Sequence, residues 1–398
     1  MGADIVIKEL NTEIKPDSIV YPIEKIISNG LKNDLTRFEF ASNYLDIAKT
    51  HISDKVINFK NFEEIQSIAK YFPRNLTSFL GFECHLGIKD ARVDWALAIS
   101  GLGKDRQVLA DVINNGSLPK QFVQQQEWKQ INDFVRYWTD ASSILYDKVK
   151  CFWLEFDMPK TSPEIPIPCA FFGPIKPSEG TANNDISQYQ WISNEALPLL
   201  RGEELSETLD KNFMQCIAKM PKNASLFQVG TLLSRSTSAI RLYINRLNPI
   251  QILTYLNSIG WIDETGEFSL LVAELEDKAD RFVISFDVTE NGINPKIGIE
   301  LSFTGDKFQN ETRWEELFDY LVEKGMCLPE KRDALLSYQG VDDDSFSGGI
   351  MKPVISATTH FASRSPGTIA RYINHIKIVY QLGQPMDAKA YPAIRLFE

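Results

Sequence analysis

Basic side chains stand at similar places on several strands that this sequence predicts. They are Arg92, Arg241, Lys296, Lys377 and Lys389. Arginine makes planar, bidentate contacts with phosphate, and lysine contributes a compact positive charge. If these residues share one face of a sheet, that face is suited to a phosphate-containing ligand. A mixture of acids and bases that neutralise one another would instead indicate a structural network or a zwitterionic ligand.

Each of these strands alternates between an apolar and a polar face. In 296–303, Lys296, Glu300 and Ser302 point to one side and four apolar residues point to the other, because successive strand side chains face opposite ways. The same split recurs around Arg92 and Asp94, around Trp153, Glu155 and Asp157, around Arg241 and Tyr243, and around His375 and Lys377. One face of the sheet therefore packs on an apolar layer, and the other meets water or a polar ligand.

Composition excludes several classes of protein. The 398 residues are 43% hydrophobic and 24% charged, with a formal net charge of -11, which is typical of a globular protein and argues against a nucleic-acid or anionic-membrane surface. No run of about 18 apolar residues and no basic segment followed by an apolar one is present. We therefore expect a soluble, cytoplasmic protein without a membrane or nucleic-acid partner.

Cysteine and histidine usage gives no sign of a metal centre. The 5 cysteines are widely spaced and odd in number, as expected for free thiols in a reducing compartment. No two of the 4 histidines stand at helical i, i+4 spacing.

Asp342, Asp343 and Asp344 fall in a segment rich in serine and glycine, where we expect a solvated turn. Gly230 is too isolated to belong to a dinucleotide-binding motif.

The pattern predicts two parts, an N-terminal helical layer over 1–78 and a barrel of repeated strand pairs and helices over 79–398, which we expect to form one structural domain. The expected pairs are 79–86 with 92–99, 150–157 with 168–173, 225–233 with 238–246, 281–288 with 295–303, and 373–380 with 387–395. Between them we expect helices over about 121–149, 203–220 and 249–259, from Thr312 to Gly325, and from Pro329 to Tyr338. In the leading layer, Asn61 is the expected N-cap of a helix, and Gly260 is expected to end the third of these helices.

Five strand pairs separated by helices predict an α+β protein, and they assemble in two main ways. An open sheet would bury its apolar face under helices and leave the charged face in water. A closed ten-stranded antiparallel barrel would place the helices around the outside and the polar residues in the lumen, and it would leave no strand edge unpaired. We favour the barrel, because polar residues recur on the inward face of the clearer pairs.

A closed barrel of repeated strand pairs ringed by helices resembles the aromatic prenyltransferases of the ABBA type. That family carries an acidic residue on its first strand and basic and tyrosine side chains, often two residues apart, on later strands. Here Glu83 lies in the first strand, and Arg241 with Tyr243 and Lys389 with Tyr391 repeat the spacing. Lys296 and Lys377 have no tyrosine two residues on, which departs from the family pattern.

The resemblance implies a metal-independent prenyltransferase that moves a prenyl group from an allylic diphosphate to an aromatic or peptide acceptor, without a cofactor. The diphosphate would contact the basic residues Arg92, Arg241, Lys296, Lys377 and Lys389. The faces of Tyr243, Tyr391 and Trp153 would stabilise an allylic cation, each by about 0.5–2 kcal/mol. Glu83 would orient the acceptor and remove a proton.

Structural interpretations of the same residues remain open. Glu83 and His85, on one face, form a hydrogen-bonded pair in one of them, and Glu300 pairs across strands with Lys296 or Lys377 in another. An alternative function is that of a non-catalytic binding or accessory protein of a biosynthetic pathway, which would hold a partner in the lumen or in an outer groove. An unrelated cyclase in the same barrel is a further alternative, because a fold does not determine a function.

Overall fold

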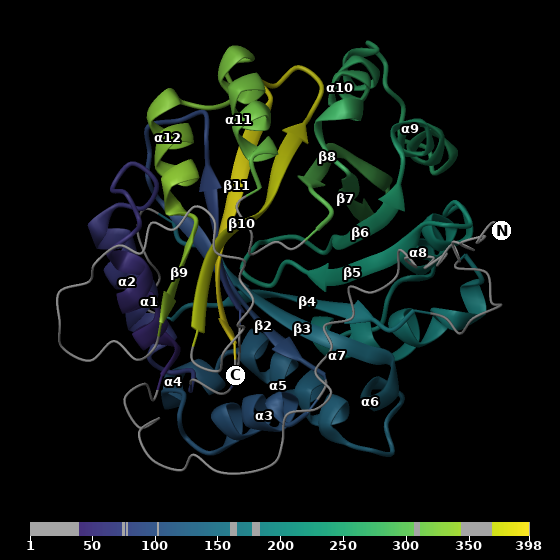
Figure 1. Ribbon diagram of the computed structural model, residues 1–398. Helices are drawn as coiled ribbons and strands as arrows, with labels where there is room; N and C mark the ends of the chain where they lie inside the picture. Colours follow the sequence, from purple (N-terminus) through teal and green to yellow (C-terminus); the bar gives the residue numbers. More distant parts are fainter. Residues whose placement is uncertain are drawn as a thin grey trace, which may run out of the picture. The chain divides into compact units, whose positions relative to one another are not determined.

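A sheet of ten antiparallel strands closes on itself in the computed structural model, which describes residues 40–73, 76, 79–101, 103–159, 165–176, 184–305, 311–343 and 368–397 (Figure 1). Its strands are β1 (Phe79–His85), β2 (Val93–Ser100), β3 (Val149–Phe156), β4 (Pro168–Pro174), β5 (Ser225–Thr231), β6 (Ile240–Leu247), β7 (Arg281–Thr289), β8 (Gly292–Ser302), β10 (Thr368–Tyr380) and β11 (Asp387–Phe397). All five predicted strand pairs are confirmed.

Closure depends on the last strand of the ring. β11 pairs antiparallel with β10 on one side and with β1 on the other, so the first and last strands of the ring are neighbours. A short strand, β9 (Gly340–Asp343), pairs with the first half of β10, whose second half pairs with β8. The barrel predicted from the alternation of faces is therefore confirmed, and its ten strands surround a lumen.

Helices lie around the outside of this barrel and between the strand pairs in sequence (Figure 1). They are α1 (Ala41–Lys49), α2 (Phe59–Ala69), α3 (Asp105–Asn114), α4 (Lys120–Val123), α5 (Gln126–Thr139), α6 (Ile144–Lys148), α7 (Leu197–Arg201), α8 (Glu207–Ala218), α9 (Pro249–Ser258), α10 (Glu267–Leu275), α11 (Arg313–Glu323) and α12 (Pro329–Tyr338), with short helical turns η3 (Ile186–Gln188), η4 (Ile192–Ala196) and η5 (Glu276–Lys278). In the described part of the chain, no helix is long and apolar enough to cross a membrane.

The hydrophobic core occupies the layer between helices and strands. Leu242, Ile299 and Ala390 belong to it, as do the buried residues of the helices, whereas their neighbours Arg241 and Lys389 form ion pairs on the opposite face. The amphipathic helix α5 contributes to this layer by burying Trp128 and Trp138, whose indole N–H groups donate to carbonyl oxygens at 3.0 Å.

The long helix predicted over 121–149 is wrong, because the chain forms α4, α5 and α6 there instead. The break after α5 has a local cause. Asp140 accepts hydrogen bonds from the backbone N–H and hydroxyl of Ser142 at 2.8 and 2.7 Å, and Ser143 caps α6 by accepting from the N–H of Leu145. Such side chains compete with helical hydrogen bonds, so a continuous apolar stripe does not ensure a continuous helix.

Two other local predictions need correction. Asn61 is not an N-cap, because Asn58 caps α2 and the buried Asn61 accepts a hydrogen bond from the N–H of Val93. Asp342 and Asp343, expected in a turn, belong to β9, while Asp344 lies outside the described residues. Residues 1–39 of the predicted N-terminal helical layer also lie outside them. Gly260 ends α9 with φ 93°, as predicted.

Gly230 sets how closely a ring lies against the barrel wall. The side chain of Phe171, fully buried, crosses Gly230 so closely that a Cβ atom there would lie 2.0 Å from Phe171 Cδ1 and 2.6 Å from the carbonyl oxygen of Ala170. Glycine is required here for close approach rather than for an unusual backbone angle. Phe171 consequently packs directly against the backbone of the barrel wall at Gly230.

We expect Gly230→Ala to destabilise the fold by about 1–3 kcal/mol, because the added methyl group overpacks against a ring and a carbonyl that cannot both move. A lower melting temperature by circular dichroism would show this. Gly81→Ala is the matched control, since the nearest atoms there are ring carbons of Phe79 at 3.1 Å. Equal melting temperatures for the two variants would contradict the close approach.

Candidate active site in the barrel lumen

The strand registers bring polar residues from distant parts of the sequence onto the inner face. Arg241 stands opposite Gly230 on β5 and Asp287 on β7, and Lys377 stands opposite Glu300 on β8 and Lys389 on β11. Directly opposite residues of an antiparallel pair share one face of the sheet. The alternation read from the sequence thus places one charged side chain after another around the lumen.

Glu83 holds a lysine and a tyrosine from β11. The Lys389 ammonium donates to one of its carboxylate oxygens, and the Tyr391 hydroxyl donates to the other at 2.5 Å. Burial opposes ionisation of Glu83, but the charges of Lys389 and Lys377 outweigh it and hold the pKa of this carboxyl well below its usual range. A carboxylate of such low basicity is a weak proton acceptor, so the contacts favour an anchoring role for Glu83 over the predicted role as a base.

Lys377 has the most buried side chain among the predicted cations. Its ammonium is 3.3 Å from Glu300 Oε1 and 4.9 Å from the centre of the Tyr243 ring, and burial lowers its pKa. Space for this side chain comes from Gly298, where a Cβ atom would lie 2.5 Å from Lys377 Cε. Of the two cross-strand pairings considered for Glu300, the structure contains the one with Lys377. The ring of His375 stacks on Tyr391 at 4.0 Å.

Arg241 and Arg235 form the two bidentate ion pairs of the lumen wall in the described residues. Arg241 donates to both carboxylate oxygens of Asp287 at 2.7 and 3.0 Å, and Arg235, in the β5–β6 connection, donates to both oxygens of Asp157 at 2.8 and 2.6 Å. The sequence did not identify Arg235 as a site residue. Arg235 follows the end of β5, where the alternation of a strand no longer predicts which way a side chain points.

Lys296 differs from the other cations in being exposed and in making no hydrogen bond or ion pair with another described residue. Burial of part of the side chain and the positive charges of Lys389, Arg241 and Arg235 lower its pKa. Lys296 therefore lies within electrostatic range of cations from β6, from β11 and from the β5–β6 connection. Those three cations are each paired with a carboxylate, whereas Lys296 is free to take an anion.

Two lumen carboxyls have raised pKa values. Burial and the charge of Glu83 raise the pKa of Glu155 to about 7, although Lys377, Arg241 and Arg235 oppose the shift. Burial and Glu83 also raise the pKa of Asp94 to about 6, against a hydrogen bond of 2.6 Å from the N–H of Met158. Alternation placed both residues on the charged face, but nothing in the sequence distinguished Glu155 from the paired acids beside it.

Aromatic and apolar side chains form a second, smaller cluster inside the barrel. Phe171 and Tyr243 meet edge to face at 5.8 Å within it, and Trp153 packs at its border and against Phe79 at 5.1 Å. Its other members are Cys169, Leu232 and Val283. The predicted residues Trp153 and Tyr243 thus lie together, with Lys377 above the face of the tyrosine.

Arg92 is placed differently from the other predicted residues. It precedes β2, and its guanidinium donates to Glu64 of α2 at 2.6 Å and to the carbonyl oxygen of Met158 at 2.8 Å. The structure thus ties Arg92 to a helix outside the barrel. His85, considered as a partner of Glu83, is 2.9 Å from Asp387 instead.

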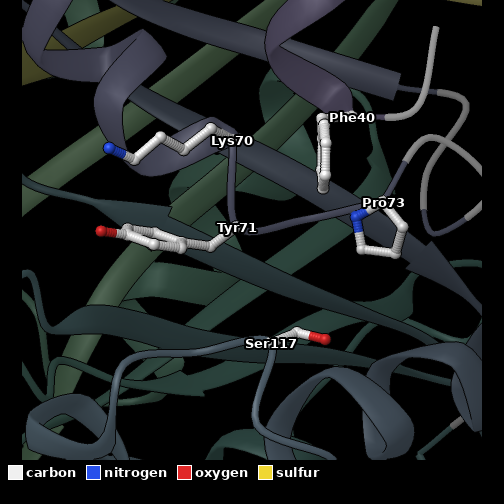
Figure 2. A pocket seen from close by; sticks show the side chains of 5 residues that line it. All are labelled: Phe40, Lys70, Tyr71, Pro73 and Ser117. Atoms are coloured by element: carbon white, nitrogen blue, oxygen red, sulfur yellow. The ribbon is translucent and has the colours of Figure 1, made fainter.

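A separate pocket of about 510 Å³ opens outside the barrel and is lined by Phe40, Lys70, Tyr71, Pro73 and Ser117 (Figure 2). Figure 2 shows the Lys70 and Tyr71 side chains extending side by side, away from Phe40 and Pro73. None of the predicted site residues lines this pocket, so it does not provide the chemistry discussed here. Among the described residues, no group of three or more metal-ligating side chains gathers in a way that would hold an ion.

Comparisons with known proteins agree with this architecture. No protein-family model matches the sequence, and no curated protein sequence matches it significantly. The structure is similar to AnaPT from Neosartorya fischeri, with 11% identity, a TM-score of 0.50, and coverage of 89% of this chain and 91% of that one. It is also similar to the prenyltransferase PriB (12% identity, TM-score 0.48, coverage 88% and 94%) and to 5-dimethylallyltryptophan synthase from Streptomyces coelicolor (10%, 0.47, 88% and 95%). The chain has the barrel fold of the ABBA-type aromatic prenyltransferases.

Proposed function

We propose that this protein is a metal-independent prenyltransferase that moves a prenyl group from an allylic diphosphate to an aromatic or peptide acceptor. The observation that carries the proposal is Lys296, a cation without a carboxylate partner among the described residues, in a barrel whose interior also holds the aromatic cluster of Phe171, Tyr243 and Trp153. Ionisation of an allylic diphosphate needs fixed positive charge at the leaving group, and electrostatic stabilisation of this kind is usually the largest catalytic contribution.

The residues divide into three roles. Lys296, Arg241 and Lys389 contact the diphosphate, and Lys377 adds its charge from deeper in the lumen. Tyr243, Tyr391 and Trp153 offer aromatic faces to the allylic cation, as Tyr243 already does to the Lys377 ammonium. Glu83 fixes Lys389 and Tyr391 and orients the acceptor beside them.

Neutralised pairs on the lumen wall favour a second candidate, a non-catalytic binding or accessory protein. Arg241, Lys377 and Lys389 each already contact a carboxylate, so a diphosphate must compete with Asp287, Glu300 and Glu83 for them. A ligand carrying both charges would face less competition. Binding of a prenyl diphosphate without turnover of any acceptor would support this alternative.

A non-hydrolysable prenyl diphosphate, such as dimethylallyl thiolodiphosphate, should raise the melting temperature of the wild-type protein. At about 100 times its dissociation constant, a ligand that binds only the folded state stabilises it by roughly 2.7 kcal/mol. Lys296→Met should weaken binding about tenfold or more, because it removes a charge-assisted contact worth about 1.5–3 kcal/mol. Arg92→Gln is the control, since Arg92 pairs with Glu64, and its shift should match that of the wild type.

The same measurement is repeated with EDTA. An unchanged shift is expected, because the proposed site uses side-chain cations instead of a metal ion. If EDTA abolished the increase in melting temperature, the diphosphate would bind through a metal ion, and the metal-independent mechanism would be overturned. No shift at millimolar ligand would overturn diphosphate binding altogether.

Replacement of Glu83 by glutamine should lower both stability and turnover. It leaves Lys389 without a carboxylate, which costs about 1–3 kcal/mol, and the melting temperature should fall at pH 7. Because the pKa of Glu83 is lower in the folded than in the unfolded protein, its stabilising contribution is present above about pH 4.5 and disappears as the pH falls below that value. The difference between variant and wild type should therefore shrink in acid.

Glu64→Gln provides the matched control for that variant, because it removes the carboxylate partner of Arg92 from outside the barrel. We expect a comparable loss of stability there with unchanged turnover of dimethylallyl diphosphate and aromatic acceptors. An unchanged melting temperature of Glu83→Gln together with a ~10²–10⁴-fold loss of turnover would contradict anchoring and restore Glu83 as the base. Unchanged turnover would remove Glu83 from the site.

A further inference from the structure

Glu155 is a lumen carboxylate without a partner. It lies on β3, opposite Ala96 of β2 and Cys169 of β4, so both neighbouring strands place small side chains beside it. Glu83, Asp157, Asp287 and Glu300 each hold a cation. Glu155, in contrast, makes no hydrogen bond or ion pair with another residue of the part of the chain that the structure describes.

The groups that face Glu155 come from several elements. They are Glu83 of β1, Cys169 of β4, Arg235 of the β5–β6 connection, Arg241 and Tyr243 of β6, and Lys377 of β10. Burial and the negative charge of Glu83 disfavour the ionised form, whereas the three cations favour it, and the resulting pKa is about 7. General bases work best when their pKa lies near the operating pH.

We infer that Glu155 is the proton acceptor of the reaction, a role that rests on the proposed prenyltransferase function. The C–O bond of the allylic diphosphate breaks, and the diphosphate leaves with the electron pair. A new bond then joins the prenyl C1 to a ring carbon of the acceptor. The proton that this carbon loses passes to the Glu155 carboxylate, which becomes a neutral carboxylic acid and later releases the proton to water.

Geometry separates Glu155 from the other acids of the lumen. A proton acceptor needs an oxygen that is not already holding a cation, and the oxygens of Glu83 are occupied by Lys389 and Tyr391. Glu155 also lies on the same strand as Trp153, two residues away on the same face, which brings it to the aromatic cluster where a planar acceptor would pack.

The test compares Glu155→Gln with the wild type and with Glu83→Gln, using dimethylallyl diphosphate and L-tryptophan or other aromatic acceptors over pH 5–9. Wild-type turnover should rise with pH through a single ionisation near pH 7. Glu155→Gln should lose ~10²–10⁴-fold in turnover at pH 8 and should lose this pH dependence. Glu83→Gln should keep a single ionisation but move it below pH 7, because the variant removes a negative charge that raises the pKa of Glu155. Turnover of Glu155→Gln within twofold of the wild type, or with the same pH dependence, would overturn the role.

Melting temperature against pH gives a readout without activity. The pKa of Glu155 is higher in the folded than in the unfolded protein, so its ionisation destabilises the fold as the pH rises from about 4.5 through 7. Glu155→Gln should therefore melt at a higher temperature than the wild type at pH 8 and at the same temperature near pH 4.5. A lower melting temperature at pH 8 would mean that Glu155 has a structural partner and would overturn the inference.

Failure of the two proposals is distinguishable. A wild-type protein that turns over no donor overturns the prenyltransferase function, and the role of Glu155 falls with it. An active wild type with an equally active Glu155→Gln variant overturns the role of Glu155 alone.

Discussion

Pairing of β11 with both β10 and β1 is the constraint on which the lumen depends. An open sheet would leave two rows of backbone groups unpaired and would give water access to the charged face. In the closed ring, the same face is shielded from bulk water, and a buried charge there is costly unless a partner of opposite charge lies beside it. The ion pairs Glu83–Lys389, Glu300–Lys377 and Asp287–Arg241 follow from that requirement.

The architecture could be predicted because it follows from local regularities. The alternation of apolar and polar residues along each strand predicted which segments are strands and which face of each strand is apolar. The apolar layer around Leu242 and Ile299 lies on the predicted face. Helix boundaries were less predictable, because a few side-chain hydrogen bonds decide them. Asp140 and Ser142 end α5 within an apolar stripe that continues beyond it.

Partners within the site could not be read from the sequence, because they depend on register between distant strands. Glu83 meets Lys389 across 306 residues, and no local pattern specifies that contact. The alternation of polar and apolar residues identified both residues as lying on the charged face, but it did not show that they pair. Arg92 shows the converse, because it precedes β2, and its side chain follows the position of Glu64 on α2 instead of the period of the strand. Glu155 stands out only when its neighbours are known to be paired already.

The span between Glu83 and Lys389 also has a consequence for synthesis. Among the strands of the ring, the ribosome makes β1 first and β11 last. Glu83 therefore cannot pair with Lys389 until 306 further residues have been translated. Until then β1 and β10 lack a neighbour on one side, and exposed strand edges favour aggregation. The lumen therefore cannot close before β11 has been translated.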